Sequence, residues 1–549
     1  MAHVHSKKRM RDAALMAQLD ERGDGALDKL GITRADLLAM LPKFQGTIVF
    51  PEDPDYNKDR MLFNPVFDPY PMMIIYCVVN SDVQQALMLA KIPPQPFTVR
   101  SGGHCTAGFS AGSGILIDVS ALNDVYVDPN AMFATVGCGC NFGKFRAALQ
   151  PYGLHVPGGE CDDVCIGGYM QGGGYGFTSV TLGMNCDNVL SMRVLLANGQ
   201  IVNASPTENY DLWWAMRGGT GGSFGILLNV TYQLVPLGDV FGWAIIWPLS
   251  TSGDINNATI ALNVLQDRYM GTNPTSAPSN NLNIQVSLCY QPGIVGGLPL
   301  PPAPMYPYLM VRGIWVGNAT DGQAAIQTLC NLPGATTQWT QETDFDTLND
   351  ALLNVPYGMP CFAKDAVMPR EDKASRIVAR KLTSAEWQGL LNYFVSTPNP
   401  YSYFYMEFYG GAINAYPMIE SAYVHRTALY NAVLDVFWWN DEEKGPSQAF
   451  LDGWIALMEP LYNGEVYQNY PRLNDPNFKS KYWGAAQNAL KLVKMKYDFN
   501  TAFSFAQCIV QRGVRPTEAD SVEGIPPKLL AAIRSPIVAK SDRKGAKVA

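Results

Sequence analysis

The sequence predicts an α+β fold, on two observations. From residue 46 to residue 240, short runs of β-branched residues alternate with glycine-rich turns, and helical stretches such as 81–91 and 142–153 lie between them. From 241 to 460, proline-rich segments separate further strands and helices in a region rich in aromatic residues. A mixture of strands and helices of this kind is typical of the α+β class. A chain of 549 residues is long enough to bury a substantial core.

Composition divides the chain into five parts. Residues 1–45 begin with basic residues but lack the apolar core of a secretory signal, so we expect a helical extension there. Residues 46–240 and 241–460 are the two large parts, and 461–515 adds a strand-like segment followed by a helical run. Residues 516–549 end in a basic stretch that predicts a solvated tail.

Charge and cysteine content argue against several kinds of partner. The formal net charge is −8 and the isoelectric point is about 5.3, without a basic stripe, so nucleic acid is not expected to bind. No apolar stretch is long enough to span a bilayer, and we expect no membrane association. Eleven scattered cysteines without a signal peptide favour a cytoplasmic protein with mostly free thiols. The pairs Cys138/Cys140 and Cys161/Cys165 lack the usual spacing of a zinc site, so no metal is expected.

The stretch RSGGH, from Arg100 to His104, follows a strand-like run at 97–99. Glycines directly after a strand allow successive N–H groups to converge on an anion such as a phosphate. A simple turn is the alternative interpretation of this short motif. A single histidine such as His104 is also more often a hydrogen-bonded structural residue than a reactive one.

A second glycine-rich stretch, GGECDDVCIGGYMQGGGYG, runs from residue 158 to residue 176. This much glycine would weaken a helix or a strand, so the main chain here is expected to turn tightly or to lie against a large planar or phosphorylated ligand. The spacing fits neither a Rossmann fingerprint nor a P-loop. A glycine-rich packing loop is the alternative.

Taken together, the motifs form a recognisable series. Their order is RSGGH (100–104), GILIDVSALNDV (114–125), GGECDDVCIGGYMQGGGYG (158–176), DNVLSMRVLLANGQIV (187–202), DLWWAMRGGTGGSFGI (211–226), YQNY (467–470) and VKMKYDFNTAF (493–503). This series resembles the FAD-linked oxidase family with the vanillyl-alcohol-oxidase fold, in its berberine-bridge-enzyme-like branch. The resemblance implies a two-part FAD-binding domain, 46–240 with 461–515, and a substrate domain, 241–460, whose antiparallel sheet is covered by helices.

Members of this branch commonly hold FAD by two covalent bonds, from a histidine nitrogen to the flavin 8α-methyl carbon and from a cysteine sulfur to flavin C6. His104 occupies the histidine position of the resemblance. Cys161 lies six residues before the pair Gly167–Gly168, as the linked cysteine does in the family, and Cys165 stands where the family usually has glycine. We therefore expect bicovalent FAD on His104 and Cys161, with Cys165 as the alternative thiol. Both bonds require good nucleophiles, a neutral imidazole and a thiolate.

The resemblance also assigns the rest of the cofactor site. Tyr467 is expected to touch the flavin, Asn469 to hold the strand or the cofactor, and Tyr169 to reach the flavin or the substrate. Family members with valine at the position of Val164 tend to admit oxygen, which favours an oxidase that makes hydrogen peroxide; the alternative is that Val164 only packs. Further cofactor contacts are expected from Arg100, Ser101, Gly102, Gly103, Gly168, Gly173, Gly174 and Gly176.

The expected catalytic residues are Tyr470, Glu407 and Tyr405. Hydride removal from an alcohol carbon needs a base for the hydroxyl proton, and Tyr470 matches the family's tyrosine or histidine at the end of YxNY. In carbohydrate oxidases of the family, an acid on a strand of the substrate domain is paired with this tyrosine. Residues 403–411 of the present sequence resemble that strand. Strand alternation places Tyr405, Glu407 and Tyr409 on one face. A bare carboxylate would raise the tyrosine pKa, so a nearby cation or the oxidised flavin must compensate.

The expected function is an FAD-dependent oxidase of a small hydroxylated molecule, with O₂ as the acceptor, acting as a monomer or a homodimer. One candidate reaction converts the C1 hydroxyl of a sugar or oligosaccharide to a lactone. Another is oxidation or oxidative cyclisation of a phenolic or alkaloid-like secondary metabolite. A flavin-binding protein with little turnover is the alternative from a different class.

Overall fold

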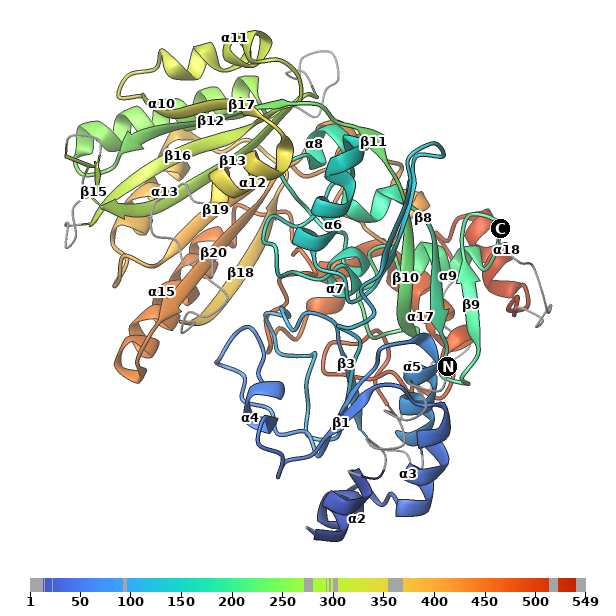
Figure 1. Cartoon of the computed structure of the whole chain (residues 1–549). Coiled ribbons are helices and arrows are strands. Elements are labelled where there is room, and N and C mark those ends of the chain that lie inside the picture. The colour runs from blue at the N-terminus through green and yellow to red at the C-terminus, as the bar shows by residue number, and fades with distance from the viewer. Residues whose placement is uncertain are drawn as a thin grey trace.

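The computed structural model describes residues 13, 15–21, 23–91, 96–270, 280–292, 294–295, 298–299, 305–353, 369–512 and 522–539. The described chain contains a four-stranded, a five-stranded and a seven-stranded sheet, together with two two-stranded sheets, β7 (Leu154–His155) with β11 (Val235–Pro236) and β14 (Ile294–Val295) with β15 (Leu298–Pro299). Helices pack around the three larger sheets (Figure 1). This arrangement confirms the predicted α+β class. No helix within the described ranges is long and apolar enough to cross a bilayer.

The first small sheet has the strand order β1-β2-β4-β3. Its strands are β1 (Thr47–Val49), β2 (Met73–Tyr76), β3 (Phe97–Arg100) and β4 (Ile115–Asp118). β2, β4 and β3 are parallel, and β1 is antiparallel to β2. Ile75 and Ile117 are fully buried between the sheet and helix α5 (Asn80–Leu89), as expected for a parallel sheet with near-continuous apolar strands.

Two short helices lie before this sheet. α2 (Gly25–Leu30) ends at Gly31, which has a φ of +62°, and α3 (Arg34–Met40) begins with a capping box in which Thr33 and Asp36 satisfy each other's main-chain N–H groups. α3 packs on α5. Much of the residue 1–45 segment is therefore helical where it is described, while residues 1–12 lie outside the described part.

The second small sheet is antiparallel and has the order β5-β6-β10-β8-β9. Its strands are β5 (Val125–Asp128), β6 (Phe133–Gly137), β8 (Val189–Leu195), β9 (Ile201–Ala204) and β10 (Ile226–Gln233). The helices that contact it are α6 (Phe142–Leu149), α7 (Ile166–Gln171) and α9 (Tyr210–Ala215), whereas α8 (Ser179–Leu182) contacts the seven-stranded sheet. Alternate residues of β6 and β10, among them Val136 and Val230, are fully buried, which is the period-two burial of a strand with one face on the core.

The C-terminal segment returns to these two sheets. It contains α16 (Phe478–Trp483), α17 (Gln487–Tyr497) and α18 (Pro527–Arg534). α17 and α18 pack on α9 and on each other, and in Figure 1 the orange and red C-terminal elements lie beside the green β9 and β10. Segments from the two ends of the chain thus form one unit.

The large sheet has seven antiparallel strands in the order β17-β12-β16-β13-β19-β20-β18. Its strands are β12 (Val240–Pro248), β13 (Leu282–Pro292), β16 (Met305–Trp315), β17 (Thr336–Thr343), β18 (Arg370–Val378), β19 (Tyr403–Phe408) and β20 (Tyr430–Trp438). Helices α10 (Ser252–Arg268), α11 (Ala319–Cys330), α13 (Ser384–Val395) and α15 (Asp441–Met458) cover one face (Figure 1). Trp243 and Trp247 of β12 point into the core on this side.

The other face of the large sheet points toward the two smaller sheets. α12 (Phe345–Leu353) lies near one end of this face, where Leu348 packs with Val240 and Ile314. Strand alternation decides which side chains face inward. On β19, Phe404 and Met406 belong to the helix-side core, so Tyr405 and Glu407 face the smaller sheets.

Candidate active site

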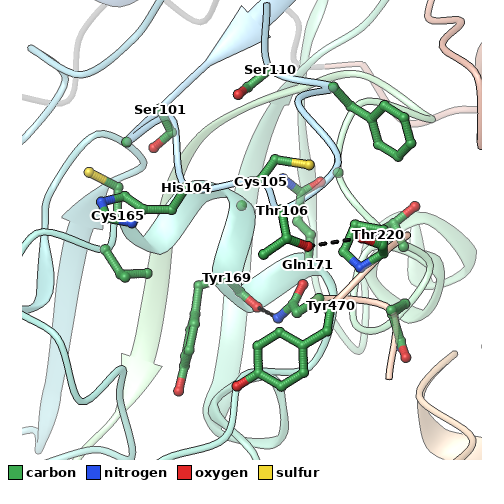
Figure 2. Close-up of a pocket in the computed structure, with 18 of the residues that line it drawn as sticks. Ser101, His104, Cys105, Thr106, Ser110, Cys165, Tyr169, Gln171, Thr220 and Tyr470 are labelled. Carbon is green, nitrogen blue, oxygen red and sulfur yellow. Dashed lines mark hydrogen bonds between the residues drawn. The ribbon is translucent and has the colours of Figure 1, made fainter. Parts of the chain in front are cut away.

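A cavity of about 450 Å³ is lined by residues of both the smaller sheets' part of the chain and the large sheet. Figure 2 shows part of its wall, including His104, Cys165, Tyr169 and Tyr470. Its wall combines residues of the RSGGH stretch, of the 158–176 stretch and of the YQNY segment with inward-facing side chains of the large sheet. Three separate sequence motifs therefore meet at one site, and the third lies nearly 300 residues after the second.

Within RSGGH, the side chain of Arg100 lies away from the cavity that the next four residues line. Ser101, Gly102, Gly103 and His104 line the cavity, and Gly103 has a φ of +76°, a conformation that favours glycine. Arg100 is not among the described residues that line it. Its Nε donates to the Asp118 carboxylate at 2.6 Å, inside the first sheet. Arg100 thus forms a buried ion pair between neighbouring strands, and its contact with the cofactor stays a prediction.

His104 is held as a neutral ring. Its imidazole stacks on Phe63 with a centroid separation of 4.3 Å. Burial lowers the pKa of His104 to about 4, although the charge of Asp163 opposes this shift. At neutral pH the imidazole therefore carries a lone pair, as a nucleophile must.

The two cysteines of the 158–176 stretch occupy different surroundings. Both line the cavity. Cys165 is buried, its thiol donates to the Gly139 carbonyl at 3.3 Å, and burial raises its pKa to about 12. A Cβ atom built at Gly102 would lie 2.9 Å from the Cys165 sulfur, so this thiol packs directly on the RSGGH backbone. Cys161 is only half-buried.

The glycines of this stretch serve two purposes. A Cβ atom at Gly168 would meet nothing within 4 Å, and Gly168 lines the cavity. Gly173 and Gly174 have φ of +120° and +85°, and side chains there would overlap Tyr423 and Tyr169; a side chain at Gly176 would overlap the Gly158 carbonyl. These three glycines are not among the described residues that line the cavity. The structure shows them packed within the protein, and their cofactor contacts stay predictions.

The YQNY segment lies against the glycine-rich stretch. The Tyr467 hydroxyl accepts hydrogen bonds from the Gly174 N–H at 2.9 Å and from the Asn469 amide at 3.0 Å. The same Asn469 amide donates to the Tyr169 carbonyl at 2.8 Å, and the Tyr169 hydroxyl donates to the Tyr175 carbonyl. Tyr169, Tyr467, Asn469 and Tyr470 all line the cavity, as does Val164.

Tyr470 and Glu407 form a direct pair. The Tyr470 hydroxyl donates to Glu407 Oε1 at 2.6 Å, and the Asn431 amide donates to Oε2 at 2.8 Å. Burial raises the pKa of Glu407 to about 7, although the hydrogen bond from Tyr470 opposes this shift. Burial, together with the Glu407 charge, also raises the pKa of Tyr470 well above its usual value. Tyr405 lies beside them, with its ring edge-on to that of Tyr470 at 6.4 Å.

Tyr409 does not join this group. It follows the end of β19, its hydroxyl hydrogen-bonds that of Tyr423 at 2.5 Å, and its ring stacks on Tyr175. It is not among the described residues that line the cavity. The expected alternation therefore holds for Tyr405 and Glu407, and the strand ends before it reaches Tyr409.

A buried lysine lies beside the Tyr470 ring. Lys373 Nζ lies 5.0 Å from the centre of the Tyr470 ring, and pairs with Glu371 at 2.7 Å and Asp435 at 3.2 Å. Burial alone would lower the pKa of Lys373, but the charges of Asp435 and Glu371 more than offset it, and the pKa is raised. Burial raises the pKa of Asp435 to about 7. From the sequence, only the alternation of side chains along the strand 370–378 could have indicated that Lys373 faces this cavity.

Glu160 is a second titratable group on the cavity wall that the sequence did not predict. Glu160, the residue before Cys161, accepts a hydrogen bond from the Gln285 side-chain amide. Arg312 donates to the Gln285 oxygen and to the Tyr403 hydroxyl, at 3.1 Å in each case. Burial raises the pKa of Glu160 to about 8, with Arg312 opposing the shift.

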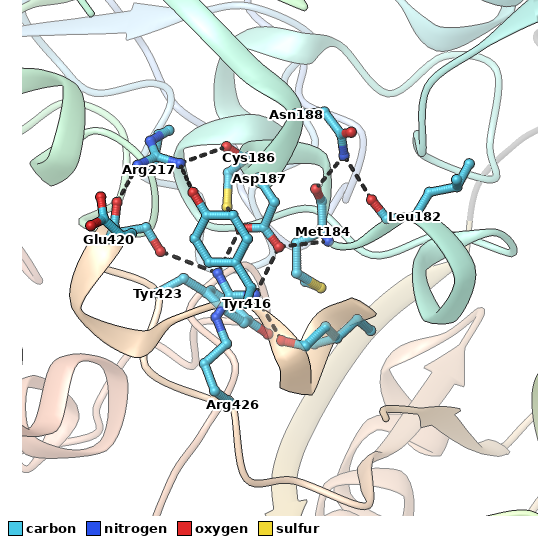
Figure 3. Close-up of polar contacts among 12 residues, drawn as sticks. Leu182, Met184, Cys186, Asp187, Asn188, Arg217, Tyr416, Glu420, Tyr423 and Arg426 are labelled. Carbon is cyan, nitrogen blue, oxygen red and sulfur yellow. Dashed lines mark hydrogen bonds and ion pairs between the residues drawn. The ribbon is translucent and has the colours of Figure 1, made fainter. Parts of the chain in front are cut away.

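Beyond the Tyr409–Tyr423 contact, an ion-pair network joins the second small sheet to the segment after β19 (Figure 3). Arg426 donates to both carboxylate oxygens of Asp187, at 2.6 and 2.8 Å. Arg217 lies over the Trp213 ring and donates to the Tyr416 hydroxyl at 2.7 Å. This network fixes the chain that follows the catalytic strand.

Comparison with known protein families shows which class of protein carries this site. Residues 71–205 match the FAD binding domain family, and residues 466–510 match the berberine and berberine-like family. The second match begins just before Tyr467 and the first includes His104 and Cys161, so both fall on the cavity wall described above. The chain is a berberine-bridge-enzyme-like flavoprotein.

Relatives of this flavoprotein match it over most of its length. An uncharacterised FAD-linked oxidoreductase of Bacillus subtilis is 29% identical over 84% of this chain and 98% of its own. A carbohydrate oxidase of Microdochium nivale is 25% identical over 87% of this chain and 95% of its own. The solved structure of a berberine-bridge-enzyme-like protein from Physcomitrella patens superposes with a TM-score of 0.74, at 24% identity, over 87% of this chain and 100% of that one, which shows a shared fold.

The cavity of this berberine-bridge-like chain fits FAD. Its wall contains the bare backbone of Gly168, the neutral imidazole of His104 and the half-buried Cys161. The volume of the cavity is within the range of ligand and cofactor pockets. The protein is an FAD-dependent oxidoreductase that acts on a small molecule.

Proposed function

We propose that the protein is an oxidase that removes hydride from the carbinol carbon of a hydroxylated substrate, with O₂ as the final acceptor and hydrogen peroxide as the product. The observation that carries this proposal is the Tyr470–Glu407 pair on the cavity wall. FAD, when bound, supplies a two-electron acceptor for the hydride. The substrate class we favour is a sugar or oligosaccharide oxidised at C1 to the lactone, and similarity to the carbohydrate oxidase supports it.

The chain's own residues move the hydroxyl proton. Tyr470 takes the proton of the substrate hydroxyl, while its own proton passes along the 2.6 Å hydrogen bond to Glu407. Because the pKa of Glu407 is about 7, its carboxylate can accept this proton near neutral pH and release it later. Lys373, 5.0 Å from the Tyr470 ring, stabilises the developing phenolate. Because the pKa of Tyr470 is raised well above its usual value, the relay of its own proton to Glu407 is what allows it to act as a base.

Several side chains support a second candidate, a phenolic alcohol. Tyr403, Tyr405 and Phe437 of the large sheet give the cavity an aromatic wall, and aromatic pairs in offset or edge-on contact are favourable. The same Tyr470–Glu407 chemistry would apply to the benzylic or allylic hydroxyl of such a compound.

A substrate panel tests the proposed function. We expect the yellow holoenzyme to bleach under anaerobic conditions with at least one sugar from glucose, cellobiose and xylobiose, and to produce peroxide in air. Aromatic alcohols such as coniferyl alcohol form the second arm. Bleaching by the aromatic arm alone would transfer the proposal to the phenolic class, and slow bleaching by every compound would contradict an oxidase and favour a flavin-binding protein.

We further propose that FAD is linked to His104 and Cys161. The low pKa of His104 supports a nucleophilic imidazole. The high pKa of Cys165 and its packing on Gly102 argue against that thiol, because a thiol that remains protonated is a poor nucleophile. Cys161 is the remaining cysteine of the stretch, and it lines the cavity.

Removal of the linking residues gives the corresponding prediction. Cys161→Ser and His104→Ala are each expected to leave one bond, so acid-precipitated protein stays yellow in both single variants and turns colourless only in the double variant. Peptide mass mapping should place flavin on the 104-containing peptide in the first variant and on the 161-containing peptide in the second. Cys165→Ser is the matched control and should keep both links. Flavin mass on the Cys165 peptide of the wild type would contradict the assignment.

Val164 supports O₂ as the acceptor. Its side chain lines the cavity beside Cys161, and it is small for a residue at a cofactor wall. This leaves a route for oxygen to the reduced cofactor.

A further inference from the structure

We propose that Glu160 recognises the substrate, by accepting a hydrogen bond from a second hydroxyl group while the first is oxidised at Tyr470. This inference rests on the proposed function and narrows it to polyhydroxylated substrates. Glu160 lies on the loop that carries Cys161, it lines the cavity, and its carboxyl accepts a hydrogen bond from Gln285 of the large sheet.

The side chain of Glu160 is held in one orientation. Arginine has only donors, so the contact from Arg312 makes the Gln285 oxygen the acceptor, and the Gln285 nitrogen must donate to Glu160. The Glu160 main chain is fixed as well, because the Asn349 amide donates to its carbonyl at 2.8 Å. Because both the main chain and the carboxyl group of Glu160 are already held in place, this residue loses little further conformational entropy when a ligand binds.

Strand register places this carboxyl near the catalytic one. Arg312, Gln285 and Glu407 stand directly opposite one another on β16, β13 and β19. Directly opposed residues have Cβ atoms about 5 Å apart and share a face. Gln285 therefore lies between two carboxyl groups. One belongs to Glu407, which pairs with Tyr470, and the other to Glu160, on the loop that carries Cys161. All three residues line the same cavity.

The chemistry of this group suits a hydroxyl donor. The oxygens of the Glu160 carboxyl can accept hydrogen bonds, and the Gln285 side-chain amide donates one of them. Burial raises the pKa of this carboxyl, and the charge of Arg312 opposes that rise only in part. A substrate hydroxyl in the cavity would supply a further donor, whereas an analogue without that hydroxyl would leave a buried acceptor unsatisfied. Sites of this kind reject the deoxy analogue strongly.

The test compares parent and deoxy sugars on Glu160→Gln. The probes are D-glucose and its 2-deoxy, 3-deoxy and 6-deoxy derivatives, measured by anaerobic flavin reduction and by the change in flavin absorbance on binding. In the wild type we expect one deoxy analogue to bind at least tenfold more weakly than glucose. In Glu160→Gln that difference should fall to less than threefold, with the limiting reduction rate at saturation changed by less than threefold.

Two further variants separate recognition from loop stability. Asp162→Asn removes a carboxylate of the same loop that pairs with Arg146 and is not among the described residues lining the cavity, and it should keep the wild-type discrimination. Gln285→Met removes the donor that orients Glu160, so it should weaken the same discrimination even if Glu160→Gln fails to fold.

The outcomes distinguish this inference from the proposed function. If the wild type oxidises sugars and Glu160→Gln weakens all four probes equally, or keeps the wild-type discrimination, the role of Glu160 is overturned and the oxidase proposal stands. If the wild type neither binds nor oxidises any of the sugars, both the sugar preference and the role of Glu160 are overturned.

Discussion

Tyr470→Phe is expected to slow flavin reduction by at least about 10²-fold at saturating substrate, within the ~10²–10⁴ range for a positioned proton acceptor. The phenylalanine ring keeps the packing against Tyr467 and Tyr405 but cannot take the substrate proton or pass one to Glu407. Anaerobic stopped-flow absorbance at the flavin band measures the rate directly. Because the hydroxyl takes part in proton transfer, the loss should appear in the limiting rate more than in the apparent affinity.

The pH dependence provides the control for this prediction. The pKa of Glu407 is about 7, and only its carboxylate form can accept the proton from Tyr470. The reduction rate of the wild type should therefore rise as the pH increases through about 7. Glu407→Gln cannot ionise, so it should be slow and should lack this rise. A Tyr470→Phe enzyme that reduces its flavin at nearly the wild-type rate would remove Tyr470 from the role of base.

Arg426→Met is expected to lower the free energy of unfolding by about 3–5 kcal/mol, because it leaves Asp187 buried without its partner. The side chains of Arg426 and Asp187 are 2% and 4% exposed, so water cannot replace the lost ion pair. Methionine keeps most of the apolar stem, which separates the loss of charge from the loss of packing. Denaturant unfolding followed by tryptophan fluorescence measures the change.

A surface pair provides the matched control for Arg426. Arg380 also makes two contacts with one carboxylate, that of Glu386, but these side chains are 46% and 27% exposed. Arg380→Met should therefore cost no more than about 1 kcal/mol. The double variant Arg426→Met with Asp187→Leu should regain part of the stability, because no charge then remains buried. Equal losses in the two single variants would contradict this account of the network.

The sequence predicted those parts of the site that depend on local pattern or on the family resemblance. His104, Tyr470 and Glu407 reach one cavity as expected, and strand alternation correctly placed Tyr405 with Glu407. The ion pair of Arg100 was not predicted, because its motif was considered without Asp118, which stands opposite it on the neighbouring parallel strand. The order of the strands decides this pairing, and the local sequence does not contain it.

Other residues could not have been predicted because their roles depend on strand register across the large sheet. Lys373 faces Asp435 only because β18 pairs with β20 in one particular register. Glu160 reaches Gln285 across 125 positions of the sequence. The glycines at 173, 174 and 176 showed that tight backbone was needed, but their partners, Tyr423, Tyr169 and Gly158, appear only in the folded chain.

The return of the C-terminal segment has a consequence for biosynthesis. The Thr106 hydroxyl donates to the Pro471 carbonyl across 365 residues of sequence, and Asn469 ties the same segment to Tyr169. At a translation rate of about 5–20 residues per second, the ribosome needs roughly 20 to 70 s to add those residues. During that interval the nascent N-terminal portion lacks one wall of its own pocket, so the vitamin-derived prosthetic group can be enclosed only when synthesis is nearly finished.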